Sequence, residues 1–227
     1  MSMGVRKTCN SYYFSVEGET ERWYLEHLQR LINSSEGAKY SVKFIIKVKK
    51  DPREMVKILS VTDKVAVSHF CDMESNDEEH VKGFRSTLNN LKAASRMGKK
   101  LSYSLSYSNF TFDLWIALHK VDCNTQLVDR KQYLKYLNDG FSTHFTSMKE
   151  YKDENNFKRY LEKITLDDVV SAIKRAEKIM NNNQLNGYKP VEYEKFTYYT
   201  ENPSLSVHEI ITDILKRCQL LSSSQTV

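Results

Sequence analysis

Apolar and polar positions alternate with two different periods along the first half of the chain. Four short runs rich in aromatic and β-branched residues predict strands at 11–16, 40–48, 64–71 and 101–107. After each run, apolar residues recur with helical spacing, which predicts helices at 19–32, 52–59, 77–97 and 112–119. Strands that alternate with helices pair in parallel, and the helices cover both faces of the sheet. The pattern predicts an α/β fold with a mainly parallel four-stranded sheet flanked by helices.

The second half of the chain has mainly helical spacing. Helices are predicted at 131–137, 157–161 and 166–180, followed by a polar loop at 181–186. A last helix is expected to begin at Ser206, because Ser206 and Glu209 have the spacing of a capping box. A boundary near 121–130 would divide the chain into an α/β domain, 1–125, and a helical region, 126–227. We expect the helical region to pack on the same core.

Composition narrows the classes of protein that fit. The chain has 227 residues, enough for one sizeable domain, and its net charge of +5 permits a nucleic-acid partner without requiring one. The scattered cysteines form no C-x-x-C pair, which excludes zinc-ribbon and thioredoxin-type sites. No apolar run has the length of a membrane span, and the first ten residues lack the apolar segment of a secretory signal. We therefore expect a cytoplasmic protein without a membrane partner.

Acidic side chains follow three of the predicted strands. Glu17 comes after the first strand, Asp72 after the third, and Ser108, Asn109 and Asp113 after the fourth. Ligands of open parallel sheets bind beyond the carboxyl ends of the strands, so these groups should share one edge. Clustered carboxylates repel one another, and a divalent cation such as Mg²⁺ relieves that repulsion and can assist phosphodiester chemistry.

Simpler explanations exist for single members of this set. Glu21 lies in the first turn of a helix, where the helix dipole alone favours an acidic residue. Asp72 after a strand is also a common turn residue. Only the coincidence of several acids at one sheet edge favours a site.

Four segments of the chain resemble known motifs. They are VEGETERWY at 16–24, FCDME at 70–74, YSNFTFDLWIALH at 107–119 and NPSLSVH at 202–208. The order of the acidic segments resembles the Toprim catalytic domain of topoisomerases, bacterial primases and OLD-type nucleases. All four together resemble more closely the RloB/AbiLii family of phage-defence proteins, from near the start of the chain to near its end.

The resemblance implies a Toprim-like fold and assigns roles to the acids. Glu17 would be a general base or metal ligand, Asp72 and Glu74 would hold Mg²⁺ or Mn²⁺, and Asp113 would occupy a third acidic position. Together with Glu21, these residues make the expected catalytic set Glu17, Glu21, Asp72 and Asp113, and the metal set Glu17, Asp72 and Glu74. The chain departs from the family's pattern where Glu74 replaces Asp, Phe110 replaces Pro and Asp113 replaces Glu.

Substrate contacts are expected from polar and basic residues near these motifs. The candidates are Ser108, Asn109, Lys49, Lys50, Lys99 and Lys100. The implied function is metal-dependent hydrolysis of RNA, such as tRNA, or of DNA, in abortive infection. The resemblance implies nucleic acid and a separate ATPase subunit as partners, and the absence of a Walker A motif is consistent with the latter. In a homo-oligomer, further copies of the chain would also be partners. The alternative is a catalytically degenerate nucleic-acid-binding or regulatory subunit of such an ATPase.

Overall fold

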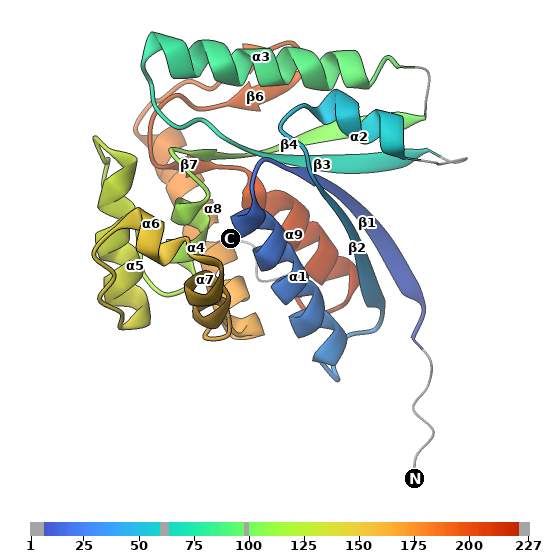
Figure 1. Ribbon diagram of the computed structural model, residues 1–227, viewed down its shortest axis with the longest axis horizontal. Coiled ribbons are helices and arrows are strands. Elements are labelled where there is room, and N and C mark those ends of the chain that lie inside the picture. The colour runs from blue at the N-terminus through green and yellow to red at the C-terminus, as the bar shows by residue number, and fades with distance from the viewer. Residues whose placement is uncertain (1–6, 60–63, 98–99, 223–227) are drawn as a thin grey trace.

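The computed structural model describes residues 7–59, 64–97 and 100–222, and its centre is a five-stranded sheet in the order β2-β1-β3-β4-β7 (Figure 1). The strands are β1 (Cys9–Val16), β2 (Ser41–Val48), β3 (Val65–Asp72), β4 (Leu101–Asn109) and β7 (Ser204–Leu205). The first four are parallel, as the sequence predicts, and the short β7 adds antiparallel to β4. Because β7 comes from the second half of the chain, that half completes the sheet.

Helices lie on both sides of the sheet. On one side are α2 (Pro52–Ile58) and α3 (Glu78–Ala94), with a hairpin of β5 (Val191–Tyr193) and β6 (Phe196–Tyr198) beside them (Figure 1). The elements of the other side are α1 (Glu19–Ser34), α4 (Asp113–Leu118), η1 (Arg130–Gln132), α5 (Tyr133–Phe141), α6 (Met148–Tyr151), α7 (Glu154–Leu161), α8 (Leu166–Leu185) and α9 (Val207–Arg217). Each side encloses its own apolar cluster, and the larger cluster combines residues from both halves of the chain.

The outer edge of β2 is partly closed by α1. Asn33 accepts a hydrogen bond from the amide of Val42 and donates one to its carbonyl, at 2.7 and 2.9 Å. Gln29 accepts a bond from the amide of Phe44. Side chains of α1 thus satisfy backbone groups that a neighbouring strand would otherwise bind.

The structure corrects the predicted loop at 181–186. Helix α8 continues through this asparagine-rich stretch to Leu185. Asparagine has a low helix propensity, but Asn183 is buried and its amide donates to the carbonyl of Pro203 at 2.9 Å. Tertiary contacts therefore extend the helix further than local preference indicates.

The capping box predicted at Ser206 is also wrong, although α9 does begin there. The Ser206 hydroxyl makes no cap hydrogen bond. It accepts a bond from the amide of Tyr107 and donates to the carbonyl of Leu105, both at 3.1 Å. Ser206 directly follows β7, so its side chain continues the pairing with β4. A capping box does form at Thr165 and Asp168, at the start of α8.

Candidate active site

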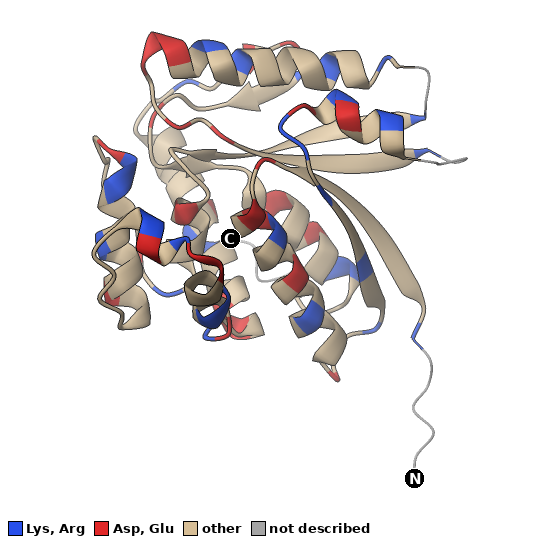
Figure 2. Ribbon diagram, viewed as in Figure 1, with Lys and Arg blue, Asp and Glu red and all other residues tan. Residues whose placement is uncertain are grey.

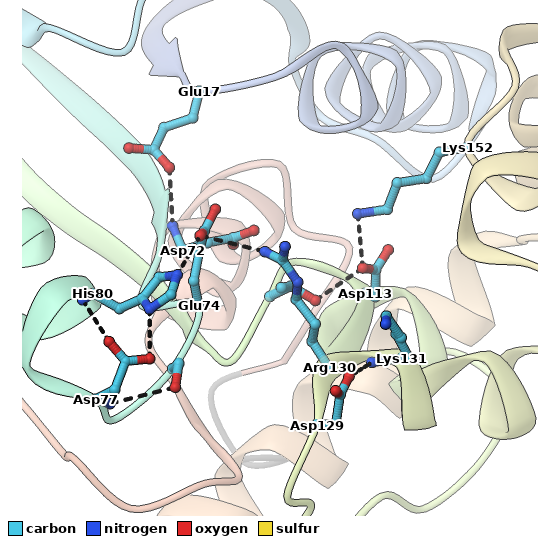
Figure 3. Close-up of polar contacts among 12 residues, drawn as sticks. Glu17, Asp72, Glu74, Asp77, His80, Asp113, Asp129, Arg130, Lys131 and Lys152 are labelled. Carbon is cyan, nitrogen blue, oxygen red and sulfur yellow. Dashed lines mark hydrogen bonds and ion pairs between the residues drawn. The ribbon is translucent and has the colours of Figure 1, made fainter.

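The carboxyl ends of β1, β3 and β4 bring the predicted acids to one edge of the sheet. Val16 pairs with Phe70, and Asp72 pairs with Ser108, so the three strands end nearly level. The Glu17 carboxylate accepts a hydrogen bond from the amide of Asp72 at 3.3 Å (Figure 3). Glu17 thereby ties the end of β1 to the end of β3.

Glu21 reaches this edge from the first turn of α1. Its side chain is 5% exposed and accepts a hydrogen bond from the hydroxyl of Thr20 at 3.0 Å. A Cβ atom at position 18 would lie 2.9 Å from the Glu21 carboxylate, closer than real Cβ contacts allow. Glycine at position 18 therefore makes room for a buried carboxylate at the start of the helix.

Asp113 enters the site from the first turn of α4, and it is only 2% exposed. Its carboxylate accepts a hydrogen bond from the hydroxyl of Thr111 at 2.8 Å and forms an ion pair with the ammonium of Lys152 at 2.9 Å (Figure 3). The hydroxyl of Tyr133 accepts a bond from the Phe110 amide and donates one to the Asn109 carbonyl, both at 3.2 Å. Helix α5 thus fixes the turn that presents Asp113.

Burial raises the pKa values of three acids at this edge, Glu17, Glu21 and Asp72. Burial is the main cause that raises the pKa of Glu17 to about 7, and the charges of Glu21 and Glu74 add to it. Burial, followed by the charges of Glu21 and Glu17, raises the pKa of Asp72 well above its ordinary value. Burial likewise raises the pKa of Glu21. The carboxyl groups therefore oppose one another's ionisation in a poorly solvated place.

Lys152 brings a positive charge into contact with this group of acids. Burial alone would lower the pKa of Lys152, but the charge and hydrogen bond of Asp113 outweigh it, so this pKa lies above the ordinary value. The charge of Lys152 also offsets part of the rise in the pKa values of Asp72 and Glu21. Lys152 therefore interacts with these two acids as well as with Asp113.

Glu74 lines the same cavity as Asp72 and is held in ion pairs by two basic side chains. Its carboxylate lies 3.3 Å from the side chains of both His80 and Arg130 (Figure 3). Its φ of 60° is a left-handed conformation that non-glycine residues seldom adopt. Across the described parts of the chain, no three His, Cys, Asp or Glu side chains are grouped as ligands of one metal ion.

A cavity of about 630 Å³ opens beside the acids. Its lining includes Asp72, Asp113 and Glu74, but neither Glu17 nor Glu21. Four cations share the lining and come from the helical half of the chain: Arg130, Lys131, Lys149 and Lys152. Sequence reasoning missed them, because no spacing in the sequence links these residues to the strand ends. Figure 2 shows the corresponding mixture of acidic and basic residues around α6.

The expected substrate-binding lysines lie at different places. The amide of Lys49 donates to the carbonyl of Val16 at 2.8 Å, which puts it at the carboxyl edge, and the charge of Lys50 lowers the pKa of Glu17. Lys100 precedes β4 and lies at the opposite edge, eight residues or about 26 Å from Ser108. Lys99 is outside the described residues. The structure thus brings Lys49 and Lys50, but not Lys100, to the acids.

Ser108 and Asn109 are the last two residues of β4. Both are buried, and neither lines the cavity. The Asn109 amide donates to the carbonyls of Thr200 and Glu201, at 2.8 and 3.2 Å. These bonds hold the segment that leads into β7.

Fold and site together define a class: a mainly parallel α/β protein whose strand ends gather buried carboxylates beside a cation-rimmed cavity. The chain belongs to the RloB-like protein family, whose model matches residues 12–214. A role in defence is consistent with that membership. No curated protein and no solved structure is similar enough to the chain to match it. Among the described residues, none of the helices combines the length and apolarity needed to cross a membrane.

Proposed function

We propose that this chain is a metal-dependent, Toprim-type nuclease that hydrolyses phosphodiester bonds in anti-phage defence. The observation that carries the proposal is the set of buried acids with raised pKa values beside a cavity that also presents cations. Acids of this kind suit proton transfer near neutral pH, and the cations suit a phosphate. Few other chemistries need both at once.

The donor set fits Mg²⁺ or Mn²⁺ in its chemistry. These ions prefer carboxylate oxygens, and a bound cation would relieve the mutual repulsion by which Glu21 and Glu17 raise the pKa of Asp72. Asp72 and Glu74 would hold the ion, with Glu74 released from Arg130 and Glu17 left free as the general base. When bound, the ion would lower the pKa of water and neutralise charge on the phosphate.

The chain's own residues would complete the reaction. Glu17, with a pKa of about 7, would accept a proton from the attacking water at physiological pH. Lys152 and Arg130 would orient the phosphate by charge-assisted hydrogen bonds, and Lys131 and Lys149 would attract the backbone on either side. RNA such as tRNA is the preferred substrate class, with DNA next. A separate ATPase subunit would couple cleavage to infection, whereas the isolated chain would keep a basal activity.

A cleavage assay on tRNA and plasmid DNA with Mg²⁺ or Mn²⁺ tests the proposal. We expect the wild type to cleave one of these substrates and Asp72→Asn to lose at least a hundredfold in rate. Asp122→Asn is the matched control, because Asp122 pairs with Arg175 outside the cavity. Equal cleavage by wild type and Asp72→Asn would refute the assignment of the site.

A second candidate function is a non-catalytic regulatory subunit of the ATPase. It is favoured by the ion pairs of Glu74 with His80 and Arg130, which occupy a carboxylate that a metal site would need. Titration with Mn²⁺, followed by calorimetry, separates the two. A catalytic site binds Mn²⁺ and loses affinity in Asp72→Asn, whereas a regulatory module shows no binding that depends on Asp72.

A further inference from the structure

A second cavity is lined almost entirely by carboxamides. It has a volume of about 230 Å³ and lies where the loop after α4, the end of α8 and the segment before β7 meet. Six of its nine lining residues carry a side-chain amide, and none is charged: Asn124, Gln126, Asn182, Asn183, Asn186 and Asn202. We call it the amide pocket. Such a neutral lining is unusual in a chain in which 28% of the residues are charged.

The floor of the amide pocket is fixed by hydrogen bonds. Asn202 accepts from the Leu127 amide at 2.7 Å and donates to the Leu127 carbonyl at 2.9 Å. The amide of Asn183 donates to the carbonyl of Pro203 at 2.9 Å. Both asparagines are at least nine-tenths buried. Their bonds join three segments distant in sequence, so the floor is a built part of the fold.

The rim of the pocket is left open for a ligand. In the described parts of the chain, the side chains of Asn124, Asn182 and Asn186 form no hydrogen bond. Gln126 donates to the hydroxyl of Tyr188 at 3.0 Å, which holds the phenol ring at the edge of the pocket. The rim thus offers unpaired amides next to one aromatic face.

We infer that the amide pocket binds an unpaired nucleobase. A carboxamide places an acceptor oxygen beside a donor nitrogen, and the edge of a base presents the complementary pair. An aromatic ring adds a stacking surface that any base can use. A neutral lining suits a base, whereas a phosphate would need the cations that this cavity lacks.

The position of the pocket agrees with a nucleic acid bound at the carboxylate cavity. Gln126 of the amide pocket and Arg130 of the carboxylate cavity are four residues apart, at most about 14 Å along the chain. One strand could therefore occupy both within a few nucleotides. This inference rests on the proposed function for its substrate class, and it adds a site that would select the sequence cleaved.

Binding without metal tests the inference directly. Fluorescence anisotropy in EDTA would compare labelled ten-nucleotide RNAs of A, C or U with an abasic strand of equal length. We expect the wild type to bind one of the three homopolymers about tenfold more tightly than the abasic strand, and Asn182→Ala/Asn186→Ala to bind all four strands within about twofold. Asn181→Ala is the matched control, since Asn181 is an exposed neighbour outside the lining.

The outcomes separate this inference from the nuclease proposal. A base preference that is the same in wild type and double variant, or absent from both, overturns the inference even if Asp72-dependent cleavage is found. A base preference that requires Asn182 and Asn186 supports the inference. If the same protein cleaves no substrate, the nuclease proposal is refuted while the inference stands. Thermal unfolding of the double variant checks that it is folded. Tyr188→Ala, which removes the ring and the hydroxyl that Gln126 binds, should weaken binding of the preferred homopolymer in the same assay.

Discussion

Glu17 should make the stability of the protein depend on pH in a way that one substitution removes. Its pKa is raised from 4.5 to about 7, mainly by burial. A group with a raised folded-state pKa contributes stability that is fully present below its unfolded pKa and is lost as pH rises through its folded pKa. Glu17 should therefore destabilise the fold progressively between these two values. Glu17→Gln keeps the shape of the protonated side chain and cannot ionise.

The size of the effect follows from the shift. Between about pH 5.5 and pH 8, a change of pKa from 4.5 to about 7 lowers the free energy of unfolding by about 2 kcal/mol. For a chain of this length, that corresponds to about 4 to 8 °C in melting temperature. The glutamine variant lacks this loss, so its advantage over wild type should grow by the same amount.

The comparison must be a difference between two proteins, because buried histidines titrate in the opposite sense. Burial lowers the pKa values of His69, His119 and His208 to about 4. The stability that these neutral histidines contribute is present above their ordinary pKa of 6.5 and is lost as pH falls through about 4. Both proteins carry these histidines, so their effect cancels in the difference.

Urea unfolding in EDTA, at several values between about pH 5.5 and pH 8, would measure the difference. A gap between Glu17→Gln and wild type that stays constant across this range would refute the burial argument. Glu26→Gln serves as the control, since Glu26 lies on the same helix, α1, with a side chain that is 45% exposed.

Three further substitutions test contacts around the site and sheet. Lys152→Met leaves Asp113 without its ion pair and should lower the free energy of unfolding in urea by about 1–2 kcal/mol, a value reduced because the lysine is partly exposed. Lys149→Met, at an exposed lysine, should lower it little. Ser206→Ala leaves a buried backbone amide of β4 unpaired and should cost about 1–3 kcal/mol by the same measurement. Asn33→Ala removes two bonds to the edge of β2 and should cost about 1–2 kcal/mol, with faster hydrogen exchange confined to the start of that strand.

Each of these expectations can be contradicted. Equal losses for Lys152→Met and Lys149→Met would mean that the ion pair with Asp113 contributes nothing specific. An unchanged free energy in Ser206→Ala would mean that the contact with β4 is replaced by water. Protection of β2 that survives Asn33→Ala would assign the closure of the edge to Gln29 alone.

The long elements of the fold could be predicted because their side chains carry their own signal. The run SVKFIIKV, for example, has the β-branched and aromatic content of a strand and forms β2. Strand β7 has only two residues, too few to show any period, and it exists because Ser204 and Leu205 lie beside β4. The asparagines at the end of α8 gave the opposite signal from the structure they adopt, since their helix is completed by contacts with the segment before β7.

The candidate site likewise has residues that the sequence predicts and residues that it does not. Glu17, Asp72 and Asp113 follow strands, and the rule for parallel sheets predicts that they meet. Lys152 and Arg130 reach the cavity from helices whose position depends on packing, so the sequence holds no local sign of their role. The direction of Glu74 was equally hidden, because it is set by a left-handed turn and by partners on α3 and η1.

Helix α4 has a consequence for how the protein could be divided. Every residue from Asp113 to Leu118 is buried, so this helix has no face of its own toward water. A chain cut between residues 122 and 129 would leave α4 bare in one fragment and its covering helices α5 and α8 bare in the other. Each fragment should aggregate when produced alone, and co-expression should restore a soluble pair. Asp113 and Lys152 would then belong to different polypeptides, so the carboxylate cavity would form only when the two fragments reassemble. The chain could therefore be used as a split protein that reports the association of its two fragments.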